Sequence, residues 1–245
     1  MKKKEFDSRI TRSGNKSSMI ASVMRSQKEL WIEEHKDPRF LVRVHADKPS
    51  GPIPGFVDFL KEKQLNPEQT KIFDAGCGKG RNSIYLADNG FKVVGGDFAP
   101  KAVIDAKAKV GEQKNLEFRE MDLGEPWGFE KEFDAVIDCD TSICLPNPER
   151  EQMIQSAHEA LKSGGYYLFY GVARTELVNT NPGPEPNSVI FPETGKFEKQ
   201  YTKEELIEVF ARYGFHLINL VEPTGSDVVE GKQTTFPMWV AIFQK

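Results

Sequence analysis

The sequence predicts an α/β protein with a doubly wound, mostly parallel sheet of seven strands and an antiparallel last strand. Short apolar segments alternate with helical segments from residue 71 to residue 172, which is typical of repeated β-α units. Two later apolar segments, 215–221 and 238–244, have no helix between them, which indicates an antiparallel pair at one edge. The first apolar segment ends in Asp74 and three closely spaced glycines. A strand ending in such a turn brings bare backbone against a ligand.

The size and composition fit one large globular domain with an appendage. The chain has 245 residues, of which 38% are hydrophobic and 29% charged. No apolar run reaches the roughly 18 residues that span a membrane, and no apolar segment follows the Lys-rich start. Cys77, Cys139 and Cys144 have no C-x-x-C spacing, so we expect no disulfide framework, no metal site and a cytoplasmic location.

The amino-terminal region differs from the rest in charge. Residues 1–28 carry eight Lys or Arg side chains against two acidic ones. Apolar residues within 19–31 recur at helical spacing and predict an amphipathic helix that acts as a lid. We therefore divide the chain into a basic arm with lid helix, 1–52, and a main domain, 53–245. The basic arm is either a solvated terminus or an attraction site for nucleic acid or an anionic substrate.

The main domain is predicted element by element. A Pro- and Gly-rich connector, 47–55, precedes a short helix beginning at Phe56. The near-continuous apolar character of 133–140 is expected of a strand covered on both faces. The predicted strands are 71–74, 92–97, 116–122, 133–140 and 166–172, with helices at 81–89, 100–113 and 148–161 between them.

Capping and breaking residues place the later boundaries. Asn147 is expected to cap a helix with Pro148 at its first position. Thr202 and Glu205 form a capping box that opens a helix ending at Gly214. Pro182, Pro184 and Pro186, within about 171–202, predict an irregular insertion that covers the substrate.

The segment from Asp74 to Arg81 carries the functional signal. Its order is D-x-G-x-G-x-G. A dinucleotide-binding G-x-G-x-x-G fingerprint would have its third glycine at the position of Arg81. Judged from the loop residues alone, the segment is either a nucleoside-binding loop or an ordinary strand-to-helix turn. Asp97, however, ends the second strand, where a carboxylate can accept hydrogen bonds from both ribose hydroxyls of a nucleoside.

This glycine loop resembles motif I of the class I S-adenosylmethionine (SAM) dependent methyltransferases. The resemblance implies a Rossmann-like fold, SAM as cofactor and S-adenosylhomocysteine (SAH) as product. Asp74 resembles the acid that organises the amino end of the methionine moiety, and Asp122 the acceptor for the adenine amino group. Phe98 would pack on adenine, and Asp138 would face the reactive end if its register permits. The implied cofactor residues are Asp74, Ala75, Gly76, Cys77, Gly78, Gly80, Arg81, Asp97, Phe98, Met121, Asp122, Leu123 and Asp138.

Further motifs extend the resemblance to residue 172. Residues 133–136 are similar to the family's F-D-x-V strand, and 161–165 to its L-K-x-G-G turn. Residues 76–83 with 85–87 look most like the tellurite-resistance and small-molecule branch. No Asn-Pro-Pro-Tyr motif follows the fourth strand, which disfavours methylation of glutamine amides or adenine amines.

The residues do not identify a catalytic group. The sulfonium of SAM carries an activated methyl group, so the protein must mainly align the acceptor. A base is useful for a hydroxyl acceptor and optional for a thiolate, amine or metalloid. His158 and His216 are expected to be structural or surface residues. The substrate candidates are Trp31, His35, Asp140, Tyr170 and Arg174.

Three functions remain open at this point. The leading hypothesis is a methyltransferase acting on a small molecule by in-line displacement, as a monomer or homodimer without membrane contact. The second is an RNA or protein methyltransferase that uses the basic arm as its foothold. The third is a SAM-binding protein without catalysis.

Overall fold

A computed structural model describes residues 27–38, 41, 48–111, 113–229 and 232–245. The basic arm and most of the predicted helix 19–31 lie outside these residues. The first described segment, 27–36, is helical, so this helix continues beyond its predicted end at Trp31.

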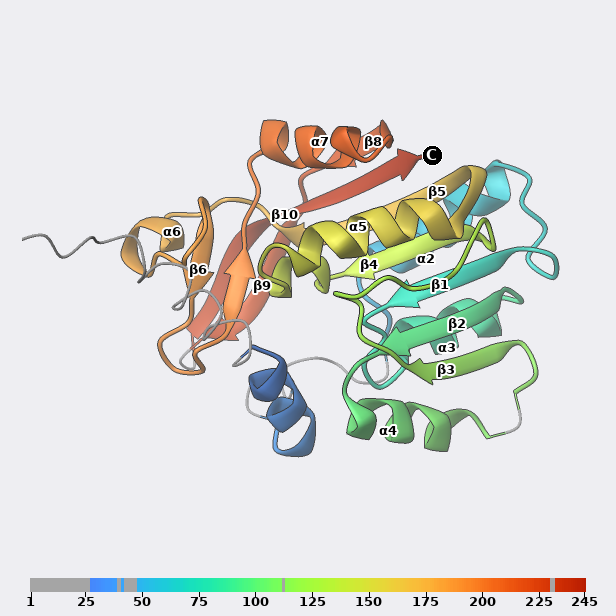
Figure 1. The fold of residues 1–245 in the computed structure, drawn as a ribbon, viewed down its shortest axis with the longest axis horizontal. Helices are drawn as coiled ribbons and strands as arrows, with labels where there is room; N and C mark the ends of the chain where they lie inside the picture. Colours follow the sequence, from blue (N-terminus) through green and yellow to red (C-terminus); the bar gives the residue numbers. More distant parts are fainter. Residues whose placement is uncertain (1–26, 39–40, 42–47, 112, 230–231) are drawn as a thin grey trace, which may run out of the picture.

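The remaining elements follow the predicted alternation of strands and helices (Figure 1). They are α2 (Pro52–Glu62), β1 (Lys71–Ala75), α3 (Arg81–Asp88), β2 (Lys92–Asp97), α4 (Pro100–Val110), β3 (Leu116–Glu120), β4 (Phe133–Cys139), the 3-10 turn η2 (Ser142–Cys144), α5 (Glu149–Ala160), β5 (Leu161–Val172), α6 (Leu177–Thr180), β6 (Ser188–Ile190), β7 (Phe197–Lys199), α7 (Lys203–Arg212), β8 (His216–Val221), β9 (Thr224–Val229) and β10 (Lys232–Gln244).

The main sheet has the strand order β3-β2-β1-β4-β5-β10-β8. The first five strands of this path are parallel, and β10 is antiparallel to both of its neighbours. The predicted seven-stranded, mostly parallel sheet with an antiparallel last strand is therefore confirmed. The expected antiparallel pair at one edge is also present: β10 pairs with β8, and β8 is the outermost strand. The amino-terminal half of β10 also pairs with β9, an eighth strand.

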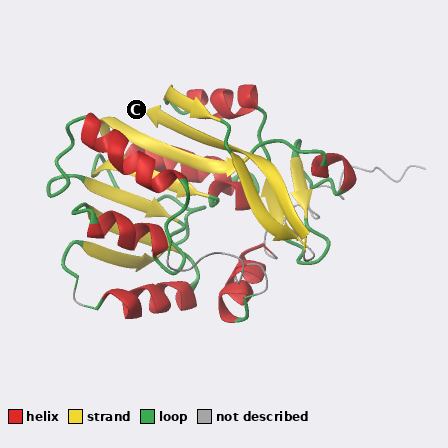
Figure 2. Ribbon diagram, turned by 180° about the vertical axis from the view of Figure 1, so that it is seen from behind, coloured by secondary structure: helices red, strands yellow, loops and turns green. Residues whose placement is uncertain are grey.

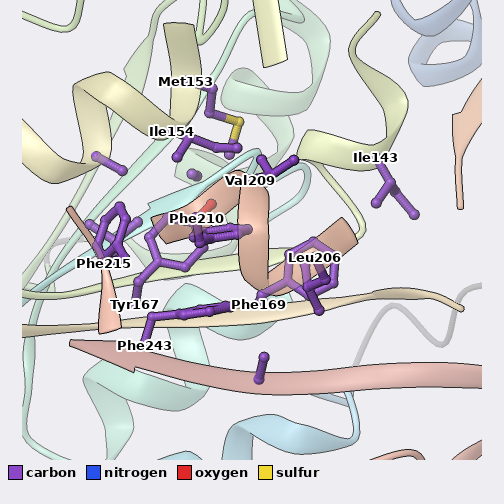
Figure 3. Packing of buried hydrophobic residues seen from close by; sticks show 14 of the residues in the cluster. Ile143, Met153, Ile154, Tyr167, Phe169, Leu206, Val209, Phe210, Phe215 and Phe243 are labelled. Atoms are coloured by element: carbon purple, nitrogen blue, oxygen red, sulfur yellow. The ribbon is translucent and has the colours of Figure 1, made fainter. Parts of the chain in front are cut away.

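Alternating side chains along the strands give the sheet two apolar faces. Ile72 of β1 packs with the buried faces of α2 and α3, whereas Phe73 packs with α5 and α7 on the other side. Figure 2 shows α2 and α3 in front of the sheet when it is seen from behind. In the second layer the rings of Phe210 and Phe243 stack with centroids 4.2 Å apart, within the aromatic cluster of Figure 3. Both helical layers of the doubly wound fold are thus present.

The cover between β5 and α7 is more ordered than predicted. We expected an irregular segment, but β6 and β7 form an antiparallel hairpin in which Ser188 pairs with Lys199 and Ile190 with Phe197. Pro182, Pro184 and Pro186 lie before β6 and Pro192 lies after it, so no proline falls within either strand. Gly195, at φ 68°, lies in the turn that joins the two strands. The hairpin places charged side chains of β7 beside the carboxyl end of the main sheet.

Two helix boundaries test the predicted caps. Thr202 does cap α7, since its side-chain oxygen accepts from the Glu205 backbone N–H. The predicted cap by Asn147 is wrong, because α5 begins at Glu149 and the Asn147 side-chain amide instead donates to Glu151 Oε1, 3.1 Å away. Within the described ranges, no helix is both long and apolar enough to cross a membrane.

Candidate functional site

The glycine loop lies in close contact with the neighbouring strand and with the segment after β4. The backbone N–H groups of Gly76 and Cys77 donate to the carbonyl of Gly96 on β2, at 2.8 and 3.0 Å. Gly76 has φ 75°, and a Cβ atom there would lie 2.1 Å from Thr141 Oγ1. Both the left-handed backbone and the contact with Thr141 therefore require glycine at this position.

Asp97 connects β2 to the same loop. Its carboxylate is buried and accepts from Gly78 N–H at 2.9 Å through Oδ2 and from Ala99 N–H at 2.8 Å through Oδ1. Each oxygen keeps a lone pair for a further donor. Burial raises the pKa of Asp97, and the two backbone N–H groups and His35 oppose that shift. Asp97 thus both holds the loop and offers two acceptors to a ligand diol.

His35 approaches this carboxylate from the amino-terminal helix. Its side chain is buried, and burial lowers its pKa, a shift that the neighbouring Asp97 carboxylate opposes. Nδ1 has no hydrogen-bond partner among the described residues. A buried polar atom without a partner is costly, so Nδ1 is suited to bind a ligand atom beside the glycine loop.

Two small cavities border the loop. One, of about 120 Å³, has walls from Gly76, Gly78, Asp97, Phe98 and Leu123 on the sheet side, with Trp31 and His35 of the amino-terminal helix opposite. The other, of about 160 Å³, has walls from His35, Gly76, Cys77, Gly78 and Arg81. The carboxyl ends of β1 and β2, the loop and the helix therefore enclose one ligand region.

A larger cavity of about 430 Å³ adjoins this region. Trp31, Asp140 and Cys144 line both it and the 120 Å³ cavity. Its walls carry five aromatic side chains, two carboxylates and three cationic side chains. These walls include Trp31, Tyr170, Phe191, Phe197 and Phe236, the carboxylates Asp140 and Glu198, and the cations Lys48, Arg81 and Lys196.

Comparison with known proteins identifies the family of the domain that carries the glycine loop. A family profile described as a methyltransferase domain matches residues 72–165. Residues 72–165 form a methyltransferase domain of the class I SAM-dependent family. SAM is accordingly the cofactor of this domain.

Individual relatives agree with the domain assignment. The chain is 28% identical over 139 residues, 56% of its length and 60% of the relative's, to a 2-heptyl-1-hydroxyquinolin-4(1H)-one methyltransferase of Mycobacteroides abscessus. It is 27% identical to the methyltransferase TehB of Haemophilus influenzae, over 56% of this chain and 47% of that one, which confirms the resemblance to the tellurite-resistance branch. The chain spans about half the length of the curated relatives it matches.

One solved structure is similar over nearly the whole chain. The 1,6-didemethyltoxoflavin-N1-methyltransferase of Burkholderia thailandensis, bound to its substrate and SAH, aligns over 98% of this chain and 93% of its own length. The TM-score is 0.66 and the sequence identity 17%. This likeness extends the shared fold to the amino-terminal helix and the cover.

The region around the glycine loop has side chains that fit SAM. The Asp97 carboxylate suits the ribose hydroxyls, and the unpartnered Nδ1 of His35 suits a polar ligand atom. A Cβ atom at Gly78 would meet only the His35 ring, at 3.8 Å, so a ligand can approach this backbone. Bound there, SAM would supply an electrophilic methyl group at a sulfonium.

Five of the predicted cofactor residues make contacts within the protein, in the loop or near it. Asp74 is buried and accepts from Ser83 Oγ at 2.5 Å, and burial raises its pKa to about 6. Met121 packs its sulfur over Gly96, where an added Cβ atom would come within 2.8 Å of it. Asp122 forms an ion pair with Lys28 of the amino-terminal helix. Ala75 ends β1 within the buried core, and Gly80 is the N-cap of α3.

Two predicted site residues lie elsewhere. Asp138 does not line the cavities: its carboxylate is fully buried and accepts from Ser142 N–H and Oγ, Thr141 N–H and Tyr167 Oη. These hydrogen bonds fix the chain after β4. Arg174 is exposed and donates to Asn187 in the cover, because its strand has ended at Val172. Its side chain lines none of the three cavities.

Other predicted substrate residues do meet at the large cavity. Trp31, Asp140 and Tyr170 line it, whereas His35 faces the glycine loop. Burial raises the pKa of Tyr170 to about 12. Sequence reasoning missed Glu198, because only the β6–β7 register shows that it reaches the cavity.

The amino-terminal helix is fastened to the cover by buried polar contacts. The Gln27 side-chain amide donates to Gly195 O at 2.9 Å and accepts from Phe197 N–H at 2.8 Å. Lys196 forms a buried ion pair with Glu34, and its ammonium lies 4.2 Å from the centroid of the Trp31 ring. The helix therefore closes the space between the cover and the methyltransferase loop.

Replacing Lys196 by methionine is expected to loosen this helix. The substitution removes the Lys196 ammonium, which now pairs with the buried Glu34 carboxylate. Removing one partner of a buried ion pair is strongly destabilising. We expect faster amide hydrogen exchange in residues 27–36 and a SAM affinity lower by up to about ten-fold. Lys36→Met is the matched control, since the Lys36 pair with Glu33 is exposed. Unchanged exchange in the Lys196 variant would contradict the lid assignment.

Proposed function

We propose that this protein transfers the methyl group of SAM to a small-molecule acceptor bound in the 430 Å³ cavity. The observation that carries the proposal is the wall shared by the two cavities: Trp31 and Asp140 border both the cofactor region and the larger cavity. An acceptor seated there would meet the reactive end of the cofactor. The volume is in the range of small-molecule sites.

The cover supports a small acceptor. The β6–β7 hairpin and residues 27–36 close over the cavity through the Gln27 and Lys196 contacts. Two similar proteins are named as methyltransferases of small molecules, a hydroxyquinolone and a didemethyltoxoflavin, which also supports a small acceptor. We infer that residues 27–36 and about 171–202 form the acceptor cover of this methyltransferase.

The side chains act mainly by binding and orientation. Asp97 would hold the ribose, with the glycine loop against the methionine moiety, while the aromatic walls align the acceptor. Fixed geometry of this kind can supply roughly 7–11 kcal/mol of the barrier reduction. Closure by residues 27–36 would also exclude water from the transfer.

An acceptor screen tests the proposal. The full chain with SAM is incubated with a panel of hydroxylated and N–H heteroaromatic molecules, and SAH release is measured. We expect SAH release and a mass gain of one methyl group for members that fit the cavity. SAM binding without SAH release across the panel would favour a non-catalytic SAM-binding protein. Release stimulated only by RNA or a protein substrate would favour the second hypothesis.

A further inference from the structure

A carboxylate lies at the boundary between the two cavities. Asp140, directly after β4, lines both of them. Its backbone N–H donates to Tyr170 O at 2.8 Å, and its carbonyl accepts from Cys144 Sγ at 3.2 Å. Its φ of 60° lies in the left-handed region, which costs free energy in a residue other than glycine. The surrounding contacts therefore hold Asp140 in an unfavourable conformation that keeps it at this boundary.

The Asp140 carboxylate is not used for structure. Among the described residues, it accepts no hydrogen bond, unlike Asp138 two positions earlier, whose oxygens accept four. Its charged neighbours are Arg81 of α3, Glu198 of β7 and Asp138 of β4. Lys48 and Lys196 also line the larger cavity.

Glu198 brings a second carboxylate to the same cavity. One of its oxygens accepts from Gln200 Nε2 at 2.9 Å, which orients the side chain. Burial raises the pKa of Asp140 to about 7; the Arg81 guanidinium opposes this shift, and the charges of Glu198 and Asp138 add to it. Burial likewise raises the pKa of Glu198 to about 7. A carboxyl group that titrates near neutral pH is matched to proton transfer at that pH.

We propose that Asp140 is the general base of the methyl transfer, that Glu198 strengthens it across the cavity, and that the acceptor is a neutral aromatic molecule methylated at an O–H or N–H group. The inference rests on the proposed function. The aromatic side chains of Trp31, Phe191 and Phe197 favour a flat apolar body. An acceptor that is already ionised needs no base, so the role assigned to Asp140 implies a neutral acceptor.

The proposed step balances in atoms and charge. The X–H bond of the acceptor breaks as its proton passes to an Asp140 oxygen, and the bonding pair remains on X. A lone pair on X forms the X–CH3 bond while the S–CH3 bond breaks with its pair going to sulfur. The positive sulfonium and the negative carboxylate are both neutralised, which leaves SAH, the methylated acceptor and a protonated Asp140.

The first test compares Asp140→Asn with the wild type on phenols of graded acidity. Asparagine tolerates the left-handed backbone, so the variant is expected to fold. We expect the transfer rate to fall about 100-fold for weakly acidic phenols. The loss should shrink as acceptor acidity rises, because phenols that reach the cavity already ionised need no base. Glu193→Gln, an exposed carboxylate of the same cover, is the control and should keep the wild-type rate.

The second test uses pH. The wild-type rate should rise as pH increases through about 7, because only ionised Asp140 accepts a proton. Glu198→Gln removes a negative neighbour, so the midpoint should move to lower pH. A raised pKa also means that ionisation of Asp140 opposes folding. Stability is therefore lost as pH rises through about 7, and Asp140→Asn should have a higher Tm than the wild type at pH 8.

The outcomes separate this inference from the proposed function. A wild type that binds SAM but methylates no acceptor would overturn both. A wild type that methylates acceptors, with an Asp140→Asn rate that is unchanged or reduced equally for all phenols, would overturn only the assignment of Asp140. A pH midpoint unmoved by Glu198→Gln would overturn the role of Glu198. SAM affinity in both variants is measured by calorimetry, and all rates are compared at saturating SAM.

Discussion

Replacing Gly76 by alanine is expected to abolish measurable SAM binding and to destabilise the fold. The new Cβ atom would lie 2.1 Å from Thr141 Oγ1 and 2.3 Å from Thr141 Cγ2. Thr141 cannot withdraw freely, because its backbone N–H donates to the buried Asp138 carboxylate at 3.2 Å. Alanine would also have to adopt φ 75°. Left-handed strain and overpacking each cost about 1–3 kcal/mol, so we expect a loss of about 2–6 kcal/mol.

Gly55 provides the matched control for this change. It lies within α2, and a Cβ atom there would meet no atom within 4 Å. Alanine at an open helical position is expected to stabilise by about 0.5–1 kcal/mol. Thermal unfolding and SAM titration of the two variants check the prediction. A Gly76→Ala protein with the wild-type Tm and SAM affinity would show that the loop is not packed against Thr141.

Replacing Asp97 by alanine is expected to weaken SAM binding by about 100-fold, roughly 3 kcal/mol. The substitution removes the paired acceptors for the ribose hydroxyls. It also leaves the N–H groups of Gly78 and Ala99 without the oxygens they now reach at 2.9 and 2.8 Å. Both losses fall on the loop that holds the cofactor, so the effect on binding should exceed that of a single ligand contact.

Two further variants locate the cause. Asp97→Asn keeps the shape and one acceptor oxygen, so its SAM affinity should be intermediate, with about a ten-fold loss. Asp58→Ala removes an exposed carboxylate of α2 and should leave the affinity unchanged. Isothermal titration calorimetry of the folded variants measures these SAM affinities. An Asp97→Ala variant with wild-type affinity would contradict the ribose assignment.

Local patterns in the sequence were sufficient for the cofactor half of the site. The strand at Lys92–Asp97 has the predicted bounds, and Asp97 lies at its end beside the glycine loop. Strand periodicity, a terminal acid and a glycine turn are all properties of a few consecutive residues. Their positions in space then follow from the parallel sheet, which brings successive strand ends to one edge.

Long-range pairing explains what the sequence could not show. Asp138 and Asp140 have the same residue type near the same strand end, yet only Asp140 lines the cavities; the difference depends on Ser142 and Tyr167 reaching Asp138. Glu198 is placed by a hairpin register across the turn at Gly195. The insertion of β10 between β5 and β8 likewise depends on contacts between distant segments.

Direct titration of the full chain with SAM tests the central claim, that the glycine loop and Asp97 bind this cofactor. The order D-x-G-x-G-x-G predicts one SAM site per chain, with SAH competing for it and NAD failing to compete. Calorimetry of SAM binding, repeated with excess SAH and with excess NAD, measures this without any acceptor. Absence of SAM binding to the folded protein, or displacement of SAM by NAD, would contradict the account.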